Sequence, residues 1–224
     1  MNFRSLAVVF FCCFCLLSCT QDRVYTEEIM EIHSVIQGET ENKIGELMFS
    51  ESELYSPDNK LEQKIQYNKD KSIKGIEKFV VKNLNNTPEK SNFYNGRDSL
   101  LSYYKMLYED DKMIRKIGFD ASNDAMLRIE EFDYDKDGNR RAKYLKSSDN
   151  FMQRQYIFTF DEFGNETSVT TKDGSGKVIV QEFFNISQKD KAGKWVEKWG
   201  FVDDKPTRYY IKSRRILKKK KSTE

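Results

Sequence analysis

The sequence contains no cysteine after residue 19 and only one histidine, His33. The four cysteines lie at positions 12, 13, 15 and 19, so the rest of the chain cannot form a disulfide and must fold through packing and hydrogen bonds. Structural zinc sites and Cys–His nucleophiles need several of these side chains. Both kinds of site are therefore excluded from the body of the protein, and we expect His33 to be a packed or solvated residue.

Familiar catalytic motifs are missing as well. The sequence has no glycine-rich phosphate loop, no G-x-S-x-G and no H-E-x-x-H. Glycoside hydrolysis needs only carboxylates, yet no two of the 36 acidic residues form an evident pair, because nearly all lie in turns or beside lysines. The sequence predicts a non-enzymatic protein without a cofactor and leaves a carboxylate-dependent, glycan-active enzyme as an alternative.

The first nineteen residues have the pattern of an export signal. A basic residue, Arg4, precedes the uncharged run 6–17, which has the length of a signal-peptide core and is short for a membrane span. The run ends in Leu16-Leu17-Ser18-Cys19, which resembles the lipobox of bacterial lipoproteins. Leu17 departs from the common pattern, which has a small residue there, and resembles the relaxed lipoboxes of spirochaetes. The resemblance implies cleavage between Ser18 and Cys19 and attachment of lipid, including palmitate, to Cys19.

A lipid-anchored product would be held at the bacterial cell envelope, either at the surface or facing the periplasm. Several acyl chains hold a protein firmly to a membrane, whereas one chain binds marginally. We therefore expect residues 1–18 to be a signal peptide and the membrane to be a partner through the lipid on Cys19. Nucleic acid is not an expected partner of an exported protein.

The body of the chain has the composition of a β-rich protein. Charged residues make up 33% and aromatic residues 13% of the sequence, unlike disordered chains, which are poor in aromatics. Aromatic and β-branched side chains favour strands. Residues 156–184 contain three short alternating or β-branched runs, separated by turn sequences at 161–165 and 173–176.

This unit of strand and turn recurs along the chain. Turn signals such as Asp58-Asn59, Asp110-Asp111, Asp137-Gly138 and Asp149-Asn150 belong to a series with a spacing of about 13 residues. The spacing predicts a mainly β fold, an antiparallel meander of short strands over 46–211, which could form a single twisted sheet, a sandwich or an open barrel. We expect 19–45 to be a tether that leads into a short helix or a first strand, and 83–92 to be a polar loop.

Two turns have a more specific pattern. Tyr134-Asp135 is followed by Gly138-Asn139, and Phe160-Asp161 by Gly164-Asn165. An aromatic-Asp pair followed by Gly-Asn resembles the core of YD (RHS-type) repeats, whose members wind long β-sheets. The resemblance covers about 60 residues and implies a β-meander with no catalytic residues.

The segment 133–138 also invites a calcium interpretation. An EF-hand loop begins with D-x-D-x-D-G and has a glutamate at position 12. Position 12 is Tyr144 here, and the flanking residues have a strand pattern. We interpret the segment as an acidic hairpin turn, with Asp133, Asp135 and Asp137 as the residues that a weakly held calcium ion would use.

Basic residues gather at the C-terminus. The segment 212–224 is predicted to be a solvated tail, with a basic patch that binds polyanions such as anionic headgroups or glycans as the alternative. The residues that would do so are Arg214, Arg215, Lys218, Lys219, Lys220 and Lys221. We expect Trp195 and Trp199 to pack on the sheet, with a stacking site for a sugar or an aromatic ligand as the alternative.

These features predict an envelope lipoprotein that acts as a binding module. A face of the β-sheet would contact a protein or glycan partner that the sequence does not identify. A structural spacer of the envelope is the alternative, since fold alone does not decide function.

Overall fold

The computed structural model describes residues 23–82 and 87–219 of the 224-residue chain. In these ranges every regular element is a β-strand, and none is a helix of the length and apolarity that a membrane span requires. The strands are β1 (Arg23–Ile36), β2 (Lys43–Tyr55), β3 (Leu61–Tyr67), β4 (Ile73–Lys82), β5 (Pro88–Asn95), β6 (Leu100–Glu109), β7 (Lys112–Asp120), β8 (Met126–Tyr134), β9 (Arg140–Ser147), β10 (Met152–Phe160), β11 (Glu166–Asp173), β12 (Val178–Lys189), β13 (Trp195–Val202) and β14 (Lys205–Lys219).

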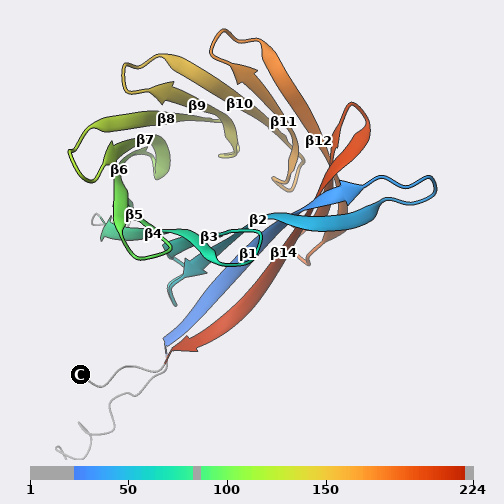
Figure 1. The fold of residues 1–224 in the computed structure, drawn as a ribbon, viewed down its shortest axis with the longest axis horizontal. Coiled ribbons are helices and arrows are strands. Elements are labelled where there is room, and N and C mark those ends of the chain that lie inside the picture. Colours follow the sequence, from blue (N-terminus) through green and yellow to red (C-terminus); the bar gives the residue numbers. More distant parts are fainter. Residues whose placement is uncertain (1–22, 83–86, 220–224) are drawn as a thin grey trace, which may run out of the picture.

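The strands form an antiparallel meander that closes into a barrel. Each strand pairs with its successor, and β14 pairs with β1 from Arg23 opposite Lys219 to Ser34 opposite Arg208. In Figure 1 the middle strands curve around a ring, and the start of β1 lies beside the end of β14 at the lower left. Closure satisfies the backbone groups that an edge strand would leave unpaired. The predicted meander is thus confirmed, and of the sheet forms left open the barrel is the one adopted.

The meander gives the barrel two distinct ends. We call the end at which β1 begins and β14 finishes the terminal end, and the opposite end the distal end. Because the strands alternate in direction, every odd-numbered strand begins at the terminal end and every even-numbered strand begins at the distal end.

Four of the hairpins share one turn structure, which explains the regular turn signals in the sequence. The turns begin at Asp135, Asp161, Asp173 and Asp190, and in each the aspartate Oδ1 accepts the backbone N–H groups two and four residues later, at 2.8–3.0 Å. The fourth residue is a glycine with φ between 71° and 90°, a conformation that most other residues avoid. Aspartate and glycine at this spacing therefore specify the turn through backbone hydrogen bonding.

The two faces of the sheet can be followed from the strand register. Residues directly opposite each other on antiparallel strands point to the same side, which places Lys64, Glu77 and Phe93 on one face. The Lys116 ammonium on β7 lies 2.7 Å from the Glu77 carboxylate on β4. A contact that skips two intervening strands must cross the inside of the curve, so this face lines the lumen.

Glycines in the strands make room for large side chains in the lumen. A Cβ atom on Gly118 would lie 2.9 Å from the Tyr104 ring, and one on Gly200 would lie 2.1 Å from the Glu182 carboxylate. Glycine in a strand often marks such a close approach. These lumen side chains therefore pack over the glycines, against the wall of the barrel.

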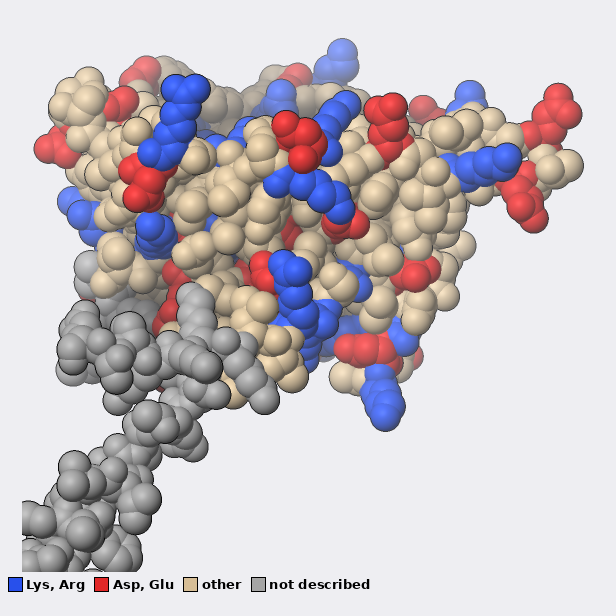
Figure 2. Space-filling view, turned by 60° about the horizontal axis from the view of Figure 1, so that its bottom comes forward, with Lys and Arg blue, Asp and Glu red and all other residues tan. Residues whose placement is uncertain are grey.

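The outer face mixes charged and aromatic side chains. Arg115 and Lys146 both pair with Glu131, and Tyr103 stacks on Phe119 with ring centroids 5.0 Å apart. Figure 2 shows basic and acidic side chains interspersed over the surface on the side that it presents.

Three segment boundaries predicted from the sequence need correction. In the segment 19–45, residues Arg23–Ile36 form β1 and β2 begins at Lys43, so the expected first strand is present, it starts at Arg23, and the described part contains no helix. The predicted loop 83–92 contains the start of β5, at Pro88, and β14 continues through the predicted tail as far as Lys219. All three segments are polar, but their backbones complete ladders with neighbouring strands.

Candidate binding site in the barrel lumen

The lumen contains a cavity of about 610 Å³. It runs inward from the terminal end, because its lining includes the first residues of β3, β5 and β9, which are Leu61, Pro88 and Arg140. A second cavity of about 630 Å³ opens at the same end, between the turns before β11 and β13 and the β1–β14 ribbon. A smaller cavity of about 180 Å³ shares Glu51 with the first and Lys212 with the second. The three cavities therefore lie next to one another along the lumen.

Ion pairs line the lumen cavity of about 610 Å³. Lys143 lies 2.8 Å and Arg128 3.2 Å from the Glu130 carboxylate, and Lys64 pairs with Glu53. Burial opposes ionisation of Glu130, but Lys143, Lys116 and Arg128 outweigh it and lower its pKa. The carboxylates are thus held in the charged form, with fixed oxygen atoms that can accept further hydrogen bonds.

Aromatic rings alternate with these charges along the wall. Lys116 lies 4.2 Å from the centre of the Tyr104 ring, and Arg140 lies 4.6 Å from that of Phe132. Tyr104 and Phe132 are 8% and 6% exposed, so most of each ring is already packed. Cations at such distances interact favourably with ring faces. The result is a wall that presents both ring edges and charged groups.

A second cluster surrounds Lys198 on β13. Its ammonium lies 3.5 Å from the centre of the Phe184 ring, 4.8 Å from Trp195 and 5.0 Å from Tyr210. The residue is 4% exposed, and the nearest carboxylate oxygen, on Glu166, is 3.9 Å away. Burial lowers the pKa of Lys198 to about 8 and raises that of Glu166.

The buried Glu182 completes this cluster. Its carboxylate accepts hydrogen bonds from Arg208 and Tyr210, each at 3.0 Å. Burial of the Tyr210 side chain and the nearby Glu182 raise the pKa of the phenol. The cluster therefore keeps Tyr210 as a neutral hydrogen-bond donor over the neutral pH range.

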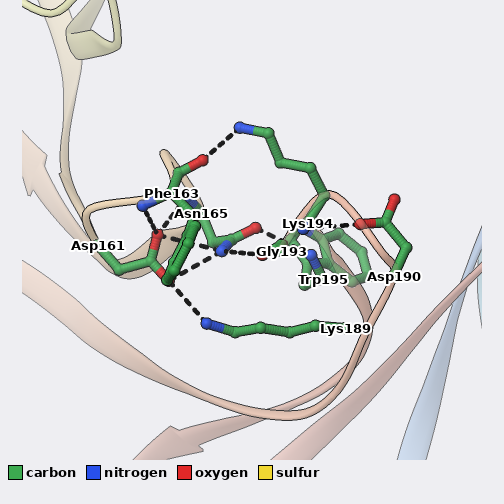
Figure 3. A network of polar contacts seen from close by, with 8 residues as sticks. All are labelled: Asp161, Phe163, Asn165, Lys189, Asp190, Gly193, Lys194 and Trp195. Atoms are coloured by element: carbon green, nitrogen blue, oxygen red, sulfur yellow. Dashed lines mark hydrogen bonds and ion pairs between the residues drawn. The ribbon is translucent and has the colours of Figure 1, made fainter.

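A network of hydrogen bonds fixes the mouth of the second cavity (Figure 3). Asn165 is 1% exposed, and its amide donates to the Asp161 carboxylate and to the Gly193 carbonyl while its oxygen accepts the Trp195 N–H. Lys194 reaches back to the Phe163 carbonyl. These bonds join the turn before β11 to the turn before β13, so Trp195 is held rigidly at the mouth.

The candidate calcium residues are held apart by other bonds. Asp133 accepts a hydrogen bond from Tyr144 at 2.9 Å, and the Asp135 carboxylate caps its own turn. Among the described residues, no group of three or more His, Cys, Asp or Glu side chains is arranged to hold a metal ion.

The predicted polyanion-binding residues lie on a paired strand. Arg214 pairs with Glu28 and Arg215 with Glu27, both across the β1–β14 ladder. Lys218 and Lys219 end the same strand, while Lys220 and Lys221, like Ser18 and Cys19, lie outside the described residues. The arginines therefore take part in barrel closure.

The two tryptophans lie on opposite faces. Trp195 lines the second cavity, and the Lys212 ammonium lies 4.0 Å from the centre of its ring. Trp199 packs on Tyr209 on the outer face, with 4.9 Å between ring centroids.

The charged lumen residues that sequence reasoning missed lie on different strands. They are chiefly Lys64, Glu77, Lys116, Glu130, Lys143, Glu182 and Lys198. The only sequence feature that could have indicated these residues is the recurrence of a charged residue at every second position of the predicted strands.

Comparison with known proteins identifies distant structural neighbours. No family model matches the chain, and no curated protein is significantly similar in sequence. A porin-like protein from Bacteroides uniformis has a TM-score of 0.45 and 9% identity, over 84% of this chain and 96% of that one. A putative outer membrane lipoprotein-sorting protein domain from Vibrio parahaemolyticus has a TM-score of 0.29 and 9% identity, over 90% and 87%. The Photorhabdus luminescens Tc holotoxin pore has a TM-score of 0.33 and 11% identity, over 72% and 9%. Likenesses this distant assign neither a fold family nor a function.

Proposed function

We propose that the protein is a non-enzymatic binding module of the bacterial envelope that takes a sugar-containing, anionic ligand into its lumen. The observation that carries the proposal is the cavity of about 610 Å³ at the terminal end, with aromatic rings and ion-paired groups on one wall. Ligand sites are typically cavities of this size. The closed barrel supplies a rigid frame in which the lining side chains are already placed.

The mixed lining favours a sugar over a purely apolar ligand. An acyl chain packed against Glu77, Lys116 and Glu130 would bury charges without hydrogen-bonding them, which is costly. Sugar hydroxyls can donate to the fixed carboxylates and accept from the cations in charge-assisted hydrogen bonds. The carbon face of a sugar ring can meanwhile pack on the exposed parts of the aromatic rings.

The charge balance favours an anionic ligand. The lining of this cavity contains five basic residues, Lys64, Lys116, Arg128, Arg140 and Lys143, against the acidic Glu51, Glu77 and Glu130. Arg140, at the rim, has no carboxylate within salt-bridge distance among the described residues and rests on the Phe132 ring. Glu166 acts on Arg140 only from beyond that distance, so a carboxylate or phosphate on the ligand would supply a direct ion pair.

Placement in the envelope rests on the sequence. The signal-peptide pattern of 1–18 and the lipobox-like Leu16-Leu17-Ser18-Cys19 support export and lipid attachment at Cys19. The lining residues offer no nucleophile–base arrangement of the kinds that need Cys or several His. Binding is therefore the role that the described lumen supports best.

Saturation-transfer NMR with the full chain in detergent tests this proposal. We expect a hyaluronan disaccharide, which is acidic, to bind, and chitobiose, which is neutral, to bind at least tenfold more weakly. Arg140→Gln should weaken binding of the acidic disaccharide at least tenfold, since a lost charge-assisted hydrogen bond costs about 1.5–3 kcal/mol.

The neighbouring arginine provides a matched control. Arg141 pairs with Asp133 on the outer face, 3.7 Å away, so Arg141→Gln should leave the affinity unchanged. If neither disaccharide gives a saturation-transfer signal, or if both arginine variants weaken binding equally, the lumen is not the binding site.

A further inference from the structure

We infer that the open cavities face the bilayer that anchors the protein, and that the ligand is the sugar headgroup of an anionic glycolipid in that same bilayer. The inference rests on the proposed function and on lipid attachment at Cys19. It follows from three features: the end at which the cavities open, the length of the connection to Cys19, and the chemistry of the outer wall.

The cavities open at the end of the barrel where the chain enters and leaves. Leu61, Arg140 and Trp195, which line the cavities, are the first residues of their odd-numbered strands. All odd-numbered strands begin at the terminal end, as does β1 at Arg23. The entrance to the lumen and the connection to the lipidated cysteine therefore lie on the same side of the molecule.

The connection is too short to let the barrel turn over. Three residues lie between Cys19 and Arg23, and the four residue steps from Cys19 to Arg23 span at most about 14 Å. Strands of eight to ten residues, tilted as in barrels, give a height of about 20–25 Å. Inverting the barrel would raise Arg23 by about that height above the bilayer, which the connection cannot reach.

The outer wall is suited to water. Its ion pairs include Arg115–Glu131, Lys146–Glu131 and Arg215–Glu27, and charged side chains on a barrel wall are costly in contact with lipid tails. The barrel therefore stands on the membrane with its terminal end downward. Headgroups are then the sugars closest to the entrance, at a high local concentration.

The distal end offers the competing orientation. Its hairpins carry exposed apolar side chains, including Ile73, Leu101, Phe151 and Ile179. If these residues met the bilayer, the entrance would face away from it. An experiment must therefore compare the two ends directly.

Energy transfer from tryptophan to a dansyl-labelled headgroup lipid makes this comparison. The lipidated full chain is placed in phosphatidylcholine vesicles, with Trp195 as the only donor in a Trp199→Phe variant. The distal donor is a Phe151→Trp change in a Trp195→Phe, Trp199→Phe background. We expect at least a threefold higher transfer efficiency from Trp195, and no transfer from either donor in Cys19→Ser versions. Equal transfer, or more from the distal donor, would overturn the inference.

A competition measurement identifies the source of the ligand. Glucuronosyl diacylglycerol is placed either in the vesicles that hold the protein or in separate vesicles, and binding of the free hyaluronan disaccharide is measured. We expect the glycolipid to weaken disaccharide binding at least fivefold only when it shares the bilayer with the protein. Equal competition from separate vesicles, or none from the shared bilayer, would contradict the inference. Absence of disaccharide binding in vesicles without glycolipid would instead contradict the proposed function.

Discussion

At the scale of single residues, the most unusual environment is that of Lys198. Lysine is almost never fully buried unless its charge is paired, yet this ammonium is enclosed by three aromatic rings with its nearest carboxylate oxygen 3.9 Å away. Cation–π attraction to the rings compensates for part of the hydration energy that the buried ammonium loses. Burial still disfavours the charged form, and the lowered pKa, about 8, reflects that cost.

The cost predicts a specific dependence of stability on pH. The unfolded chain holds the Lys198 proton up to its ordinary pKa of 10.5, whereas the folded chain releases it near 8. Between these values the unfolded state binds more protons, so the free energy of unfolding should rise with pH, by about 2–3 kcal/mol. Burial also lowers the pKa of Lys212, which contributes to both proteins. Urea unfolding of the wild type and of Lys198→Met from pH 7.5 to 10.5 should therefore show a rise that is larger in the wild type by this amount.

Two comparisons guard the measurement. Tyrosines that ionise near pH 10.5, the upper limit of the measurement, are present in both the wild type and Lys198→Met. Their contribution to the free energy of unfolding therefore cancels when the two proteins are compared. Lys205 is exposed on the neighbouring strand, and Lys205→Met should keep the pH dependence of the wild type. Parallel pH profiles for the wild type and Lys198→Met would mean that the amine is not desolvated in the folded protein.

At the scale of elements, the turns were the most predictable part of the molecule. Turn residues such as Asp, Asn and Gly recur at a regular spacing along the sequence, so the alternating runs between the turns, such as Leu61–Tyr67 and Met126–Tyr134, could be bounded correctly as strands. β1 and the end of β14 could not, because their pairing partners lie almost 200 residues apart and their sequences are polar. Predicting closure requires knowing that two such remote segments meet.

The candidate site was unpredictable for a related reason. Lys116 and Glu77 meet across the lumen from strands that are not neighbours, and no local spacing records that contact. Alternation alone says that every second side chain shares a face, but it does not say which face is enclosed. That choice depends on the direction in which the whole sheet curves.

The two Gly-Asn turns predict different costs for the same substitution. Asn165 joins its own turn to the next hairpin through Gly193 and Trp195. Within the described part of the chain, the side chain of Asn139 bonds only to Asp135 of its own turn. Asn165→Ala would leave buried backbone groups unpaired and should lower the free energy of unfolding by about 2–4 kcal/mol, against about 1 kcal/mol for Asn139→Ala. Urea unfolding at pH 7 measures both, and equal losses would show that the bridge between hairpins contributes nothing.

At the scale of the whole molecule, closure converts a row of hairpins into one cooperative unit. Every strand has two neighbours, and buried apolar side chains are few, with Met106 and Phe132 among them. Most of the order must therefore come from the continuous ladder and from the polar clusters that the lumen encloses. We therefore expect the β1–β14 ladder to contribute to the stability of the barrel as the other ladders do, although its strands come from the two ends of the described chain.

Removing residues 212–224 tests whether the β1–β14 ladder stabilises the barrel. The truncation strips β1 of its partners from Arg23 to Met30 and leaves the buried Glu27 without its arginine. We expect the free energy of unfolding to fall by more than about 3 kcal/mol, with faster hydrogen exchange spreading to β2 and β13, because an opened barrel exposes two strand edges. Arg214→Gln with Arg215→Gln keeps the ladder and removes only the charges, so it should cost about 1–2 kcal/mol. If the truncated protein instead unfolds at the same urea concentration as the full chain, the segment 212–219 is a solvated tail and the barrel is held together without it.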